Sequence, residues 1–83
     1  MRIHLIGIGG VSMSGIAQML LNEGCIVSGS DRSASALTDK LEGLGIKVYI
    51  GHSAENINNC ELVVYSAAIG ESNPERIRAK EAG

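Results

Sequence analysis

The sequence predicts an α/β fold, in which about four parallel strands in the order 3-2-1-4 form a sheet with helices on both faces. Short apolar runs alternate with stretches whose apolar residues repeat at helical spacing, which is typical of alternating strands and helices. The chain is 45% hydrophobic but contains no Phe or Trp and only two Tyr. Its core must therefore be aliphatic, as in buried parallel strands packed under helices. At 83 residues, the chain has the length of one small domain.

The first strand and the first helix are predicted from the start of the chain. Residues 3–8 form an apolar run that leads into Gly9 and Gly10, as expected of a buried strand that ends in a tight turn. From Ser12 onward the apolar residues fall on one stripe of a helix, which Gly24 ends. The stripe consists of Met13, Ile16, Ala17, Leu20 and Leu21. We expect Met13 and Met19 to be packing residues.

Two more strands and a second helix are predicted next. Residues 25–30 form the second strand, and residues 32–35 are a small polar stretch that begins a helix. Gly43 and Gly45 interrupt that helix, and residues 47–50 form a short third strand. The residues that repeat at helical spacing here are Leu37, Leu41 and Leu44.

The last part of the chain predicts a fourth strand and a third helix. Residues 51–59 are polar and rich in turn formers, with room for one helical turn, and residues 62–65 form the fourth strand. Asn is a favoured N-cap, and proline is tolerated at the first helical position. Asn73 and Pro74 therefore predict a helix over residues 74–82.

The fourth strand is expected at an edge of the sheet. A fold of this kind continues into a fifth strand beside the fourth, so residues 1–83 look like one domain that is cut before that strand. An apolar edge strand can pair with another chain. We therefore expect self-association through this edge.

Charge and composition exclude several classes of function. The net charge is −2 without a basic run, and aromatic residues make up 2% of the chain, which argues against nucleic-acid binding. Cys25 and Cys60 lie at the starts of apolar runs, where free cysteine behaves as a small hydrophobe, and they lack metal-ligand spacing. No segment is apolar over the roughly 18 residues that a membrane span needs. These observations favour a soluble, cytoplasmic domain.

The glycine-rich segment between the first strand and the first helix is the strongest local signal. It reads Gly-Ile-Gly-Gly-Val-Ser over residues 7–12. Glycines let the backbone approach a ligand closely, and a helix N-terminus offers free N–H groups to phosphate. The Rossmann-like fingerprint asks for a third glycine or alanine where this chain has Ser12. The segment therefore indicates a diphosphate site, with a tight turn that binds nothing as the alternative.

Asp31 and His52 are the next candidates. Asp31 ends the second predicted strand, 22 residues after Gly9, where an acidic residue can accept hydrogen bonds from ribose hydroxyls. The alternative is that Asp31 caps the following helix or begins a turn. His52 follows the third strand on the side where open parallel sheets bind ligands, although surface loop histidines are common.

Other charged residues are expected to be structural. His4 alternates with apolar neighbours in the first strand, which predicts a histidine that is satisfied within the sheet. The last helix is expected to present a solvated charged face made of Glu71, Glu75, Arg76, Arg78, Lys80 and Glu81. The sequence contains no G-x-x-x-x-G-K-[ST] loop, no G-x-S-x-G elbow and no His/Cys metal cluster, so we expect no catalytic residue, cofactor site or metal site here.

Several segments of the chain resemble a known family. Residues 6–17, Ile-Gly-Ile-Gly-Gly-Val-Ser-Met-Ser-Gly-Ile-Ala, resemble the opening of the Mur ligases, above all the branch that joins L-alanine to UDP-N-acetylmuramate. Further segments of that family are similar to Ser-Gly-Ser-Asp at 28–31 and Gly-His-Ser-Ala-Glu-Asn at 51–56. The same holds for Ser-Ala-Ala-Ile at 66–69 and Asn-Pro-Glu at 73–75. The resemblance covers essentially the whole chain.

The resemblance implies the UDP-sugar-nucleotide-binding domain of a cytoplasmic, ATP-dependent ligase of peptidoglycan synthesis. Such an enzyme activates the lactyl carboxylate of UDP-N-acetylmuramate as an acyl phosphate and then joins it to the amino acid. In that family the ATP loop, the magnesium ligands and the amino-acid site belong to other domains. The resemblance therefore implies that this chain binds UDP-N-acetylmuramate without being catalytic alone.

The resemblance also implies a set of substrate-binding residues. The amides of the glycine-rich loop would face the diphosphate, residues 31–33 would hold the uridine, and His52 with residues 66–69 would close the cleft. Ser12 departs from the usual glycine of the family. The full set is Gly7, Gly9, Gly10, Val11, Ser12, Ser14, Asp31, Arg32, Ser33, His52, Ser66, Ala67, Ala68 and Ile69.

Three alternatives stay open from the sequence. The first 31 residues also suit an NAD-binding module of an oxidoreductase or transport regulator, although Asp31 disfavours NADP because a 2′-phosphate would meet a carboxylate. The murein-peptide ligases share much of the glycine-rich loop. A fragment that binds nothing measurable is the third alternative.

Overall fold

The computed structural model describes residues 1–82 and contains one parallel sheet. Its strands are β1 (Arg2–Ile6), β2 (Ile26–Asp31), β3 (Lys47–Ile50) and β4 (Leu62–Val64). Their order is β3-β2-β1-β4, and every pairing is parallel. The predicted α/β class and the predicted strand order are confirmed.

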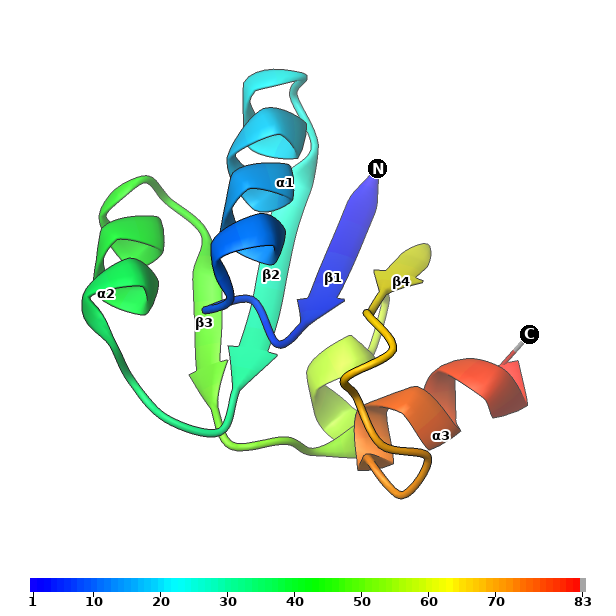
Figure 1. The fold of residues 1–83 in the computed structure, drawn as a ribbon. Helices are drawn as coiled ribbons and strands as arrows, with labels where there is room; N and C mark the ends of the chain where they lie inside the picture. The colour runs from blue at the N-terminus through cyan, green and yellow to red at the C-terminus, as the bar shows by residue number, and fades with distance from the viewer. Residues whose placement is uncertain (83) are drawn as a thin grey trace.

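The helical segments lie where the sequence pattern places them. They are α1 (Val11–Asn22), α2 (Ala36–Gly43), the 3₁₀ turn η1 (Ala54–Ile57) and α3 (Pro74–Ala82). In Figure 1, α1 and α2 lie together over one side of the sheet, whereas η1 and α3 lie together near the carboxyl ends of the strands. Within residues 1–82, no helix is long and apolar enough to span a bilayer.

Two of the helices begin at side-chain caps. The Ser35 hydroxyl accepts a hydrogen bond from the Thr38 amide at 3.2 Å, and the Thr38 hydroxyl accepts one from the Ser35 amide at 2.8 Å. The Asn73 side chain accepts from the amides of Glu75 and Arg76 at 2.9 and 3.3 Å, which confirms the predicted cap of α3. Caps of this kind satisfy amides that have no partner inside the helix.

The aliphatic core lies between the sheet and the α1–α2 layer. Ile3 and Leu5 of β1 point into it, because alternate residues of a strand face the same side. Its other buried members are Ile8, Met13, Ala17, Val27, Leu41, Ile46 and Val48. Two expectations were wrong: Ile16 is 37% exposed and Met19 is 53% exposed. Helix α1 packs against β2 and α2, whereas the side chains of these two residues reach solvent.

The opposite side of β1 and β2 carries a row of polar side chains beside Ile6. His4, Ser28 and Ser30 occupy the alternate strand positions, and β1 and β2 pair so that His4 lies opposite Ser28. His4 and Ser30 are fully buried. Buried polar groups of this kind need hydrogen-bond partners, and they find them in residues of α3 and of the segment that follows β3.

Candidate functional site

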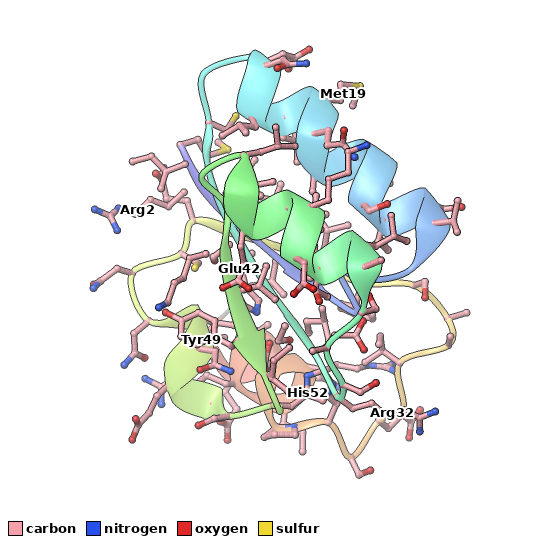
Figure 2. The ribbon with its side chains drawn as sticks, turned by 90° about the vertical axis from the view of Figure 1, so that its left-hand side faces the viewer. Arg2, Met19, Arg32, Glu42, Tyr49 and His52 are labelled. Atoms are coloured by element: carbon pink, nitrogen blue, oxygen red, sulfur yellow. The ribbon has the colours of Figure 1, made fainter. Side chains whose placement is uncertain are left out.

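A cleft of about 330 Å³ lies at the carboxyl ends of the strands. Segments that follow all four strands contribute to its lining, which brings together residues far apart in the sequence. Figure 2 shows His52 and Arg32 at this end of the molecule, with Met19 at the other end. The residues that line the cleft are Gly7, Asp31, Arg32, His52, Ala68, Ile69, Gly70 and Asn73.

The glycine-rich loop turns sharply at the end of β1. Gly7 has a φ of +79°, which favours glycine, and the amides of Gly7 and Ile8 both donate to the Ser30 carbonyl at 2.8 and 2.9 Å. The Ile69 side chain lies directly over this turn, since a Cβ on Gly7 would be 3.2 Å from the Ile69 Cδ1. The segment after β4 is therefore packed against the loop after β1.

The start of α1 leaves backbone donors free. Gly10 is the N-cap and provides no side-chain hydrogen bond, and the first turn contains no acidic residue. The first intrahelical bond runs from the Ser14 amide to the Gly10 carbonyl at 2.8 Å. In the described part of the chain, the amides of Val11, Ser12 and Met13 therefore have no acceptor. Together with the helix dipole, three such amides favour an anion.

The Asp31 carboxylate tethers the glycine-rich loop. Its Oδ2 accepts a hydrogen bond from the Gly9 amide at 2.9 Å. The cap of α2 is Ser35, so the alternative that Asp31 caps this helix is wrong. The amide of Gly10 donates to the Gly7 carbonyl at 3.1 Å. Of the loop amides predicted to face a diphosphate, those of Gly9 and Gly10 are thus bonded within the chain, and those of Val11 and Ser12 are free in this structure.

The remaining predicted residues divide into two groups. Arg32, Ala68 and Ile69 line the cleft together with Asp31 and His52. The others are not among its lining residues: Ser33, Ser66 and Ala67 are exposed, and Ser14 is buried with its hydroxyl donating to the Val11 carbonyl at 2.9 Å. The prediction that they bind substrate stays a prediction.

Glu75 was expected on a solvated helix face, and that expectation was wrong. The side chain is fully buried, although it sits in the first turn of α3. Its carboxylate is the centre of a hydrogen-bond network, which we call the Glu75 network. Its partners are His4 Nε2 at 2.5 Å, Ser30 Oγ at 2.6 Å, Asn56 Nδ2 at 3.0 Å, the Ser53 amide at 3.1 Å and His52 Nδ1 at 3.3 Å.

The network keeps the Glu75 carboxylate ionised. Burial alone would raise the pKa of Glu75, but hydrogen bonds from His4, Ser30 and Asn56 together lower it from 4.5 to about 2. At neutral pH the carboxylate therefore acts only as an acceptor, and the groups bonded to it donate. Among the described residues, no buried side-chain nitrogen or oxygen atom lacks a partner.

Both histidines belong to this network. His4 is fully buried and bonded through both ring nitrogens, to Glu75 and to the Ser28 hydroxyl, so the prediction of a satisfied sheet histidine is confirmed. The Nδ1 of His52 lies 2.9 Å from the Ser30 Oγ, and the same ring lines the cleft. His52 thus connects the buried network to the candidate ligand site.

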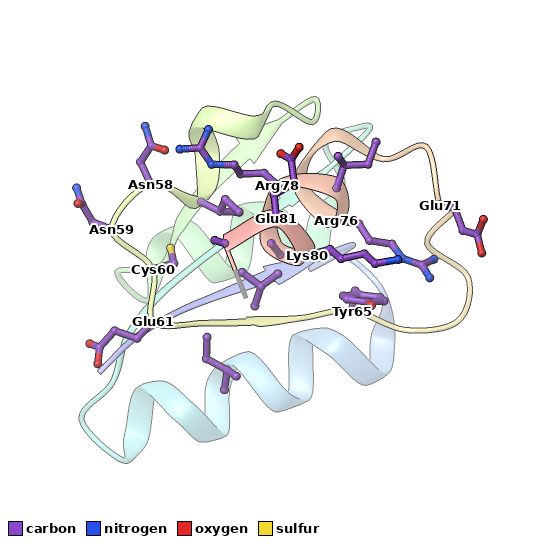
Figure 3. A pocket seen from close by; sticks show the side chains of 16 residues that line it. Asn58, Asn59, Cys60, Glu61, Tyr65, Glu71, Arg76, Arg78, Lys80 and Glu81 are labelled. Carbon is purple, nitrogen blue, oxygen red and sulfur yellow. The ribbon is translucent and has the colours of Figure 1, made fainter.

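A larger hollow of about 1100 Å³ lies elsewhere, between β4 and α3 (Figure 3). At one end of it, the Arg76 guanidinium stacks over the Tyr65 ring at 4.9 Å and donates to the Ile69 carbonyl at 2.7 Å. No residue of the glycine-rich loop lines this hollow. Of that loop, Gly7 lines the smaller cleft, whereas Gly9, Gly10, Val11 and Ser12 are not among its lining residues. We therefore take the smaller cleft as the candidate nucleotide site.

Comparison with known proteins adds the family. The model of the Mur ligase family, catalytic domain, matches residues 2–83. This chain belongs to the Mur ligase family. The glycine-rich loop, the loop that contains His52 and the Asn-Pro-Glu segment of α3 all lie within the matched region.

Curated relatives of this Mur ligase family member include UDP-N-acetylmuramate–L-alanine ligases. The chain is 61% identical over 80 residues to a UDP-N-acetylmuramate–L-alanine ligase from Clostridium beijerinckii, covering 96% of this chain and 17% of the relative. It is 59% identical over 82 residues to the ligase of the same name from Alkaliphilus metalliredigens, covering 99% of this chain and 18% of the relative. The chain thus spans less than a fifth of the length of these relatives.

Solved structures of related ligases share the fold. UDP-N-acetylmuramate-alanine ligase MurC from Thermotoga maritima matches with a TM-score of 0.94 and 38% identity, over 99% of this chain and 19% of that one. A murein peptide ligase from Psychrobacter arcticus matches with a TM-score of 0.87 and 26% identity, over 99% of this chain and 17% of that one.

Proposed function

We propose that this chain is the N-terminal, UDP-N-acetylmuramate-binding domain of a ligase that joins L-alanine to this sugar nucleotide in peptidoglycan synthesis, in the cytoplasm. The high identity to ligases of that name supports the substrate. One structural observation carries the proposal: the free amides at the start of α1 lie at the same end of the sheet as Asp31, Arg32 and His52.

The diphosphate and the ribose of a UDP-sugar each have a chemical counterpart at this end of the sheet. Amides at the start of α1 suit the negative diphosphate, because they are unpaired donors at the positive end of a helix dipole. The Asp31 carboxylate suits hydroxyl donors of the ribose. Arg32 and His52 line the cleft beside it, and Ile69 closes the cleft over Gly7.

The residues of this chain do not fit an ATP–magnesium site. Within residues 1–82, no group of three or more His, Cys, Asp or Glu side chains is placed to hold a metal ion. The sequence also lacks the G-x-x-x-x-G-K-[ST] loop that cradles a nucleotide triphosphate. We assign ATP and magnesium binding, and the amide-forming step, to parts of the ligase outside this chain.

Calorimetric titration of the chain with UDP-N-acetylmuramate, UDP and NAD tests the proposal against the NAD-binding alternative. We expect UDP-N-acetylmuramate and UDP to bind and NAD not to bind. Saturation by NAD alone would overturn the proposal and favour a dinucleotide-binding module. Gly43→Ala, at a glycine with open space around it, is the control variant and should bind the same ligands as wild type.

A further inference from the structure

The hydrogen bonds of the Glu75 network determine where its protons lie. The Oε2 of Glu75 accepts from the Ser53 amide at 3.1 Å and from Asn56 at 3.0 Å. The Oε1 accepts from His4 Nε2 at 2.5 Å and from the Ser30 hydroxyl at 2.6 Å. A hydroxyl has one proton, and that of Ser30 is directed to the carboxylate.

The direction of the Ser30 hydroxyl determines which nitrogen of the His52 ring carries the proton. The Ser30 oxygen has donated its only proton, so toward His52 Nδ1, at 2.9 Å, it can only accept. The Nδ1 also lies 3.3 Å from the Glu75 Oε2, which is likewise an acceptor. Both neighbours therefore require a proton on His52 Nδ1.

The second nitrogen of the His52 ring is left for the cleft. With Nδ1 bonded inward, Nε2 lies on the opposite side of a ring that lines the cleft beside Gly7 and Asp31. Within residues 1–82, Nε2 has no hydrogen-bond partner. In a neutral ring whose Nδ1 is protonated, Nε2 is an acceptor.

We infer that Glu75 is a positioning residue for the cleft: through Ser30 it holds His52 with its proton on Nδ1 and presents Nε2 to a hydroxyl or N–H donor of the ligand. The identity of that ligand as a sugar nucleotide rests on the proposed function, whereas the position of the proton does not. Sugar hydroxyls and the base N–H of a nucleoside share the donor chemistry that Nε2 accepts.

An isosteric substitution reverses the chain of hydrogen bonds. In Glu75→Gln, the side-chain oxygen must face the Ser53 amide, because that backbone donor cannot change role. The new NH₂ group then faces His4 Nε2 and the Ser30 oxygen and donates to both, which frees the Ser30 proton to point to His52 Nδ1, the nearer of its remaining partners. We therefore expect the His52 proton to move from Nδ1 to Nε2.

Nitrogen NMR of the imidazole rings measures this directly without any ligand. At pH 8, above the usual histidine pKa of about 6.5, we expect the Nδ1 of wild-type His52 to have the chemical shift of a protonated ring nitrogen. Its Nε2 should have the shift of an unprotonated one. A wild-type His52 with its proton on Nε2, or averaged between both nitrogens, would overturn the inference even if no variant folds.

The variants add a second test. We expect E75Q to exchange the chemical-shift types of the two His52 ring nitrogens. The control E55Q, at an exposed glutamate of η1, should leave both shifts unchanged. A folded E75Q that keeps the wild-type pattern would overturn the role of Glu75. So would an E55Q variant that exchanges the shift types.

Addition of UDP-N-acetylmuramate tests the ligand contact separately. We expect the Nε2 resonance of wild-type His52 to move toward the protonated-type value as its lone pair accepts a hydrogen bond. Binding that shifts the amides of Val11 and Ser12 and leaves Nε2 unmoved would overturn the contact. An absence of binding would overturn the proposed function while the ligand-free ring measurement still decides the role of Glu75.

Discussion

The Nε2 of His4 on β1 lies 2.5 Å from the Oε1 of Glu75 on α3, although 71 positions separate the two residues in the sequence. Both side chains are fully buried. The pair joins the first strand to the last helix, and Ser30 and Asn56 attach β2 and η1 to the same carboxylate. Removal of one partner from such a network leaves buried groups unsatisfied, which is more costly than the net value of each bond.

The Glu75 network predicts a specific loss of stability in acid. The pKa of Glu75 is about 2 in the folded chain against 4.5 ordinarily, so folding favours the ionised form. This stabilisation is complete above pH about 4.5 and is lost as the pH falls toward about 2. At pH 7, we expect Glu75→Gln to lower the free energy of unfolding by about 2 kcal/mol relative to wild type. Urea denaturation from pH 7 to pH 2.5 measures the difference.

The difference between the two chains should shrink as the pH falls, because protonation removes the charge in wild type that the variant never has. A difference that stays constant to pH 2.5 would contradict the assigned pKa. Glu71→Gln, at an exposed glutamate near the start of α3, is the matched control and should follow wild type throughout.

Gly29 is predicted to be intolerant of a methyl group. A Cβ there would lie 2.6 Å from the Ile8 Cβ and 2.8 Å from the Leu5 carbonyl, both of which are fixed by β1 and the glycine-rich loop. We expect Gly29→Ala to lower the free energy of unfolding by about 1–3 kcal/mol. Gly15→Ala, in an open position of α1, should instead stabilise by about 0.5–1 kcal/mol. Equal effects of the two substitutions in denaturant titrations would contradict this packing.

Gly9 is predicted to be required for ligand binding. A Cβ there would lie 2.8 Å from the Asp31 Oδ2 and 3.1 Å from Thr38, so any side chain displaces the tether of the loop. We expect Gly9→Val to weaken binding of UDP-N-acetylmuramate by at least about tenfold, or 1.4 kcal/mol. Calorimetry on a variant shown by circular dichroism to be folded measures this. Unchanged affinity would remove the loop from the site.

Self-association through β4 is a further prediction. The strand is at the edge of the sheet; its Leu62 is 47% exposed, and Tyr65, which directly follows the strand, is 43% exposed. An unpaired apolar edge favours pairing with a second chain, and a lysine on the edge opposes it. We expect sedimentation to show concentration-dependent dimers of wild type and monomers of Leu62→Lys. Wild type that stays monomeric to millimolar concentration would refute this role of the edge.

Patterns in the sequence were enough to predict the fold and the end of the sheet at which the cleft lies. Strand and helix periodicity, the Asn73 cap and the glycine-rich turn depend on residues close in sequence, and the handedness of parallel crossovers then predicts the order β3-β2-β1-β4. The carboxyl-end rule for parallel sheets placed Asp31 and His52 in one cleft.

The burial of Glu75 could not be predicted in the same way. Its neighbours along α3 are charged, and its position in the first turn is typical of a solvated acid that favours the helix dipole. Its partners His4 and Ser30 lie 71 and 45 positions away. The polar alternation of His4, Ser28 and Ser30 was a usable signal, because such a strand face needs a buried partner. The bond between Gly9 and Asp31 likewise depends on how the loop folds back onto β2.

Residue-resolved NMR titration of the chain with UDP-N-acetylmuramate tests the central claim most directly. We expect the amide resonances of Val11, Ser12 and Met13 to shift together with that of Asp31 and to saturate, while residues around the hollow between β4 and α3 stay unchanged. Shifts confined to that hollow, or the same loop shifts with NAD and none with UDP-N-acetylmuramate, would contradict a sugar-nucleotide site at the start of α1.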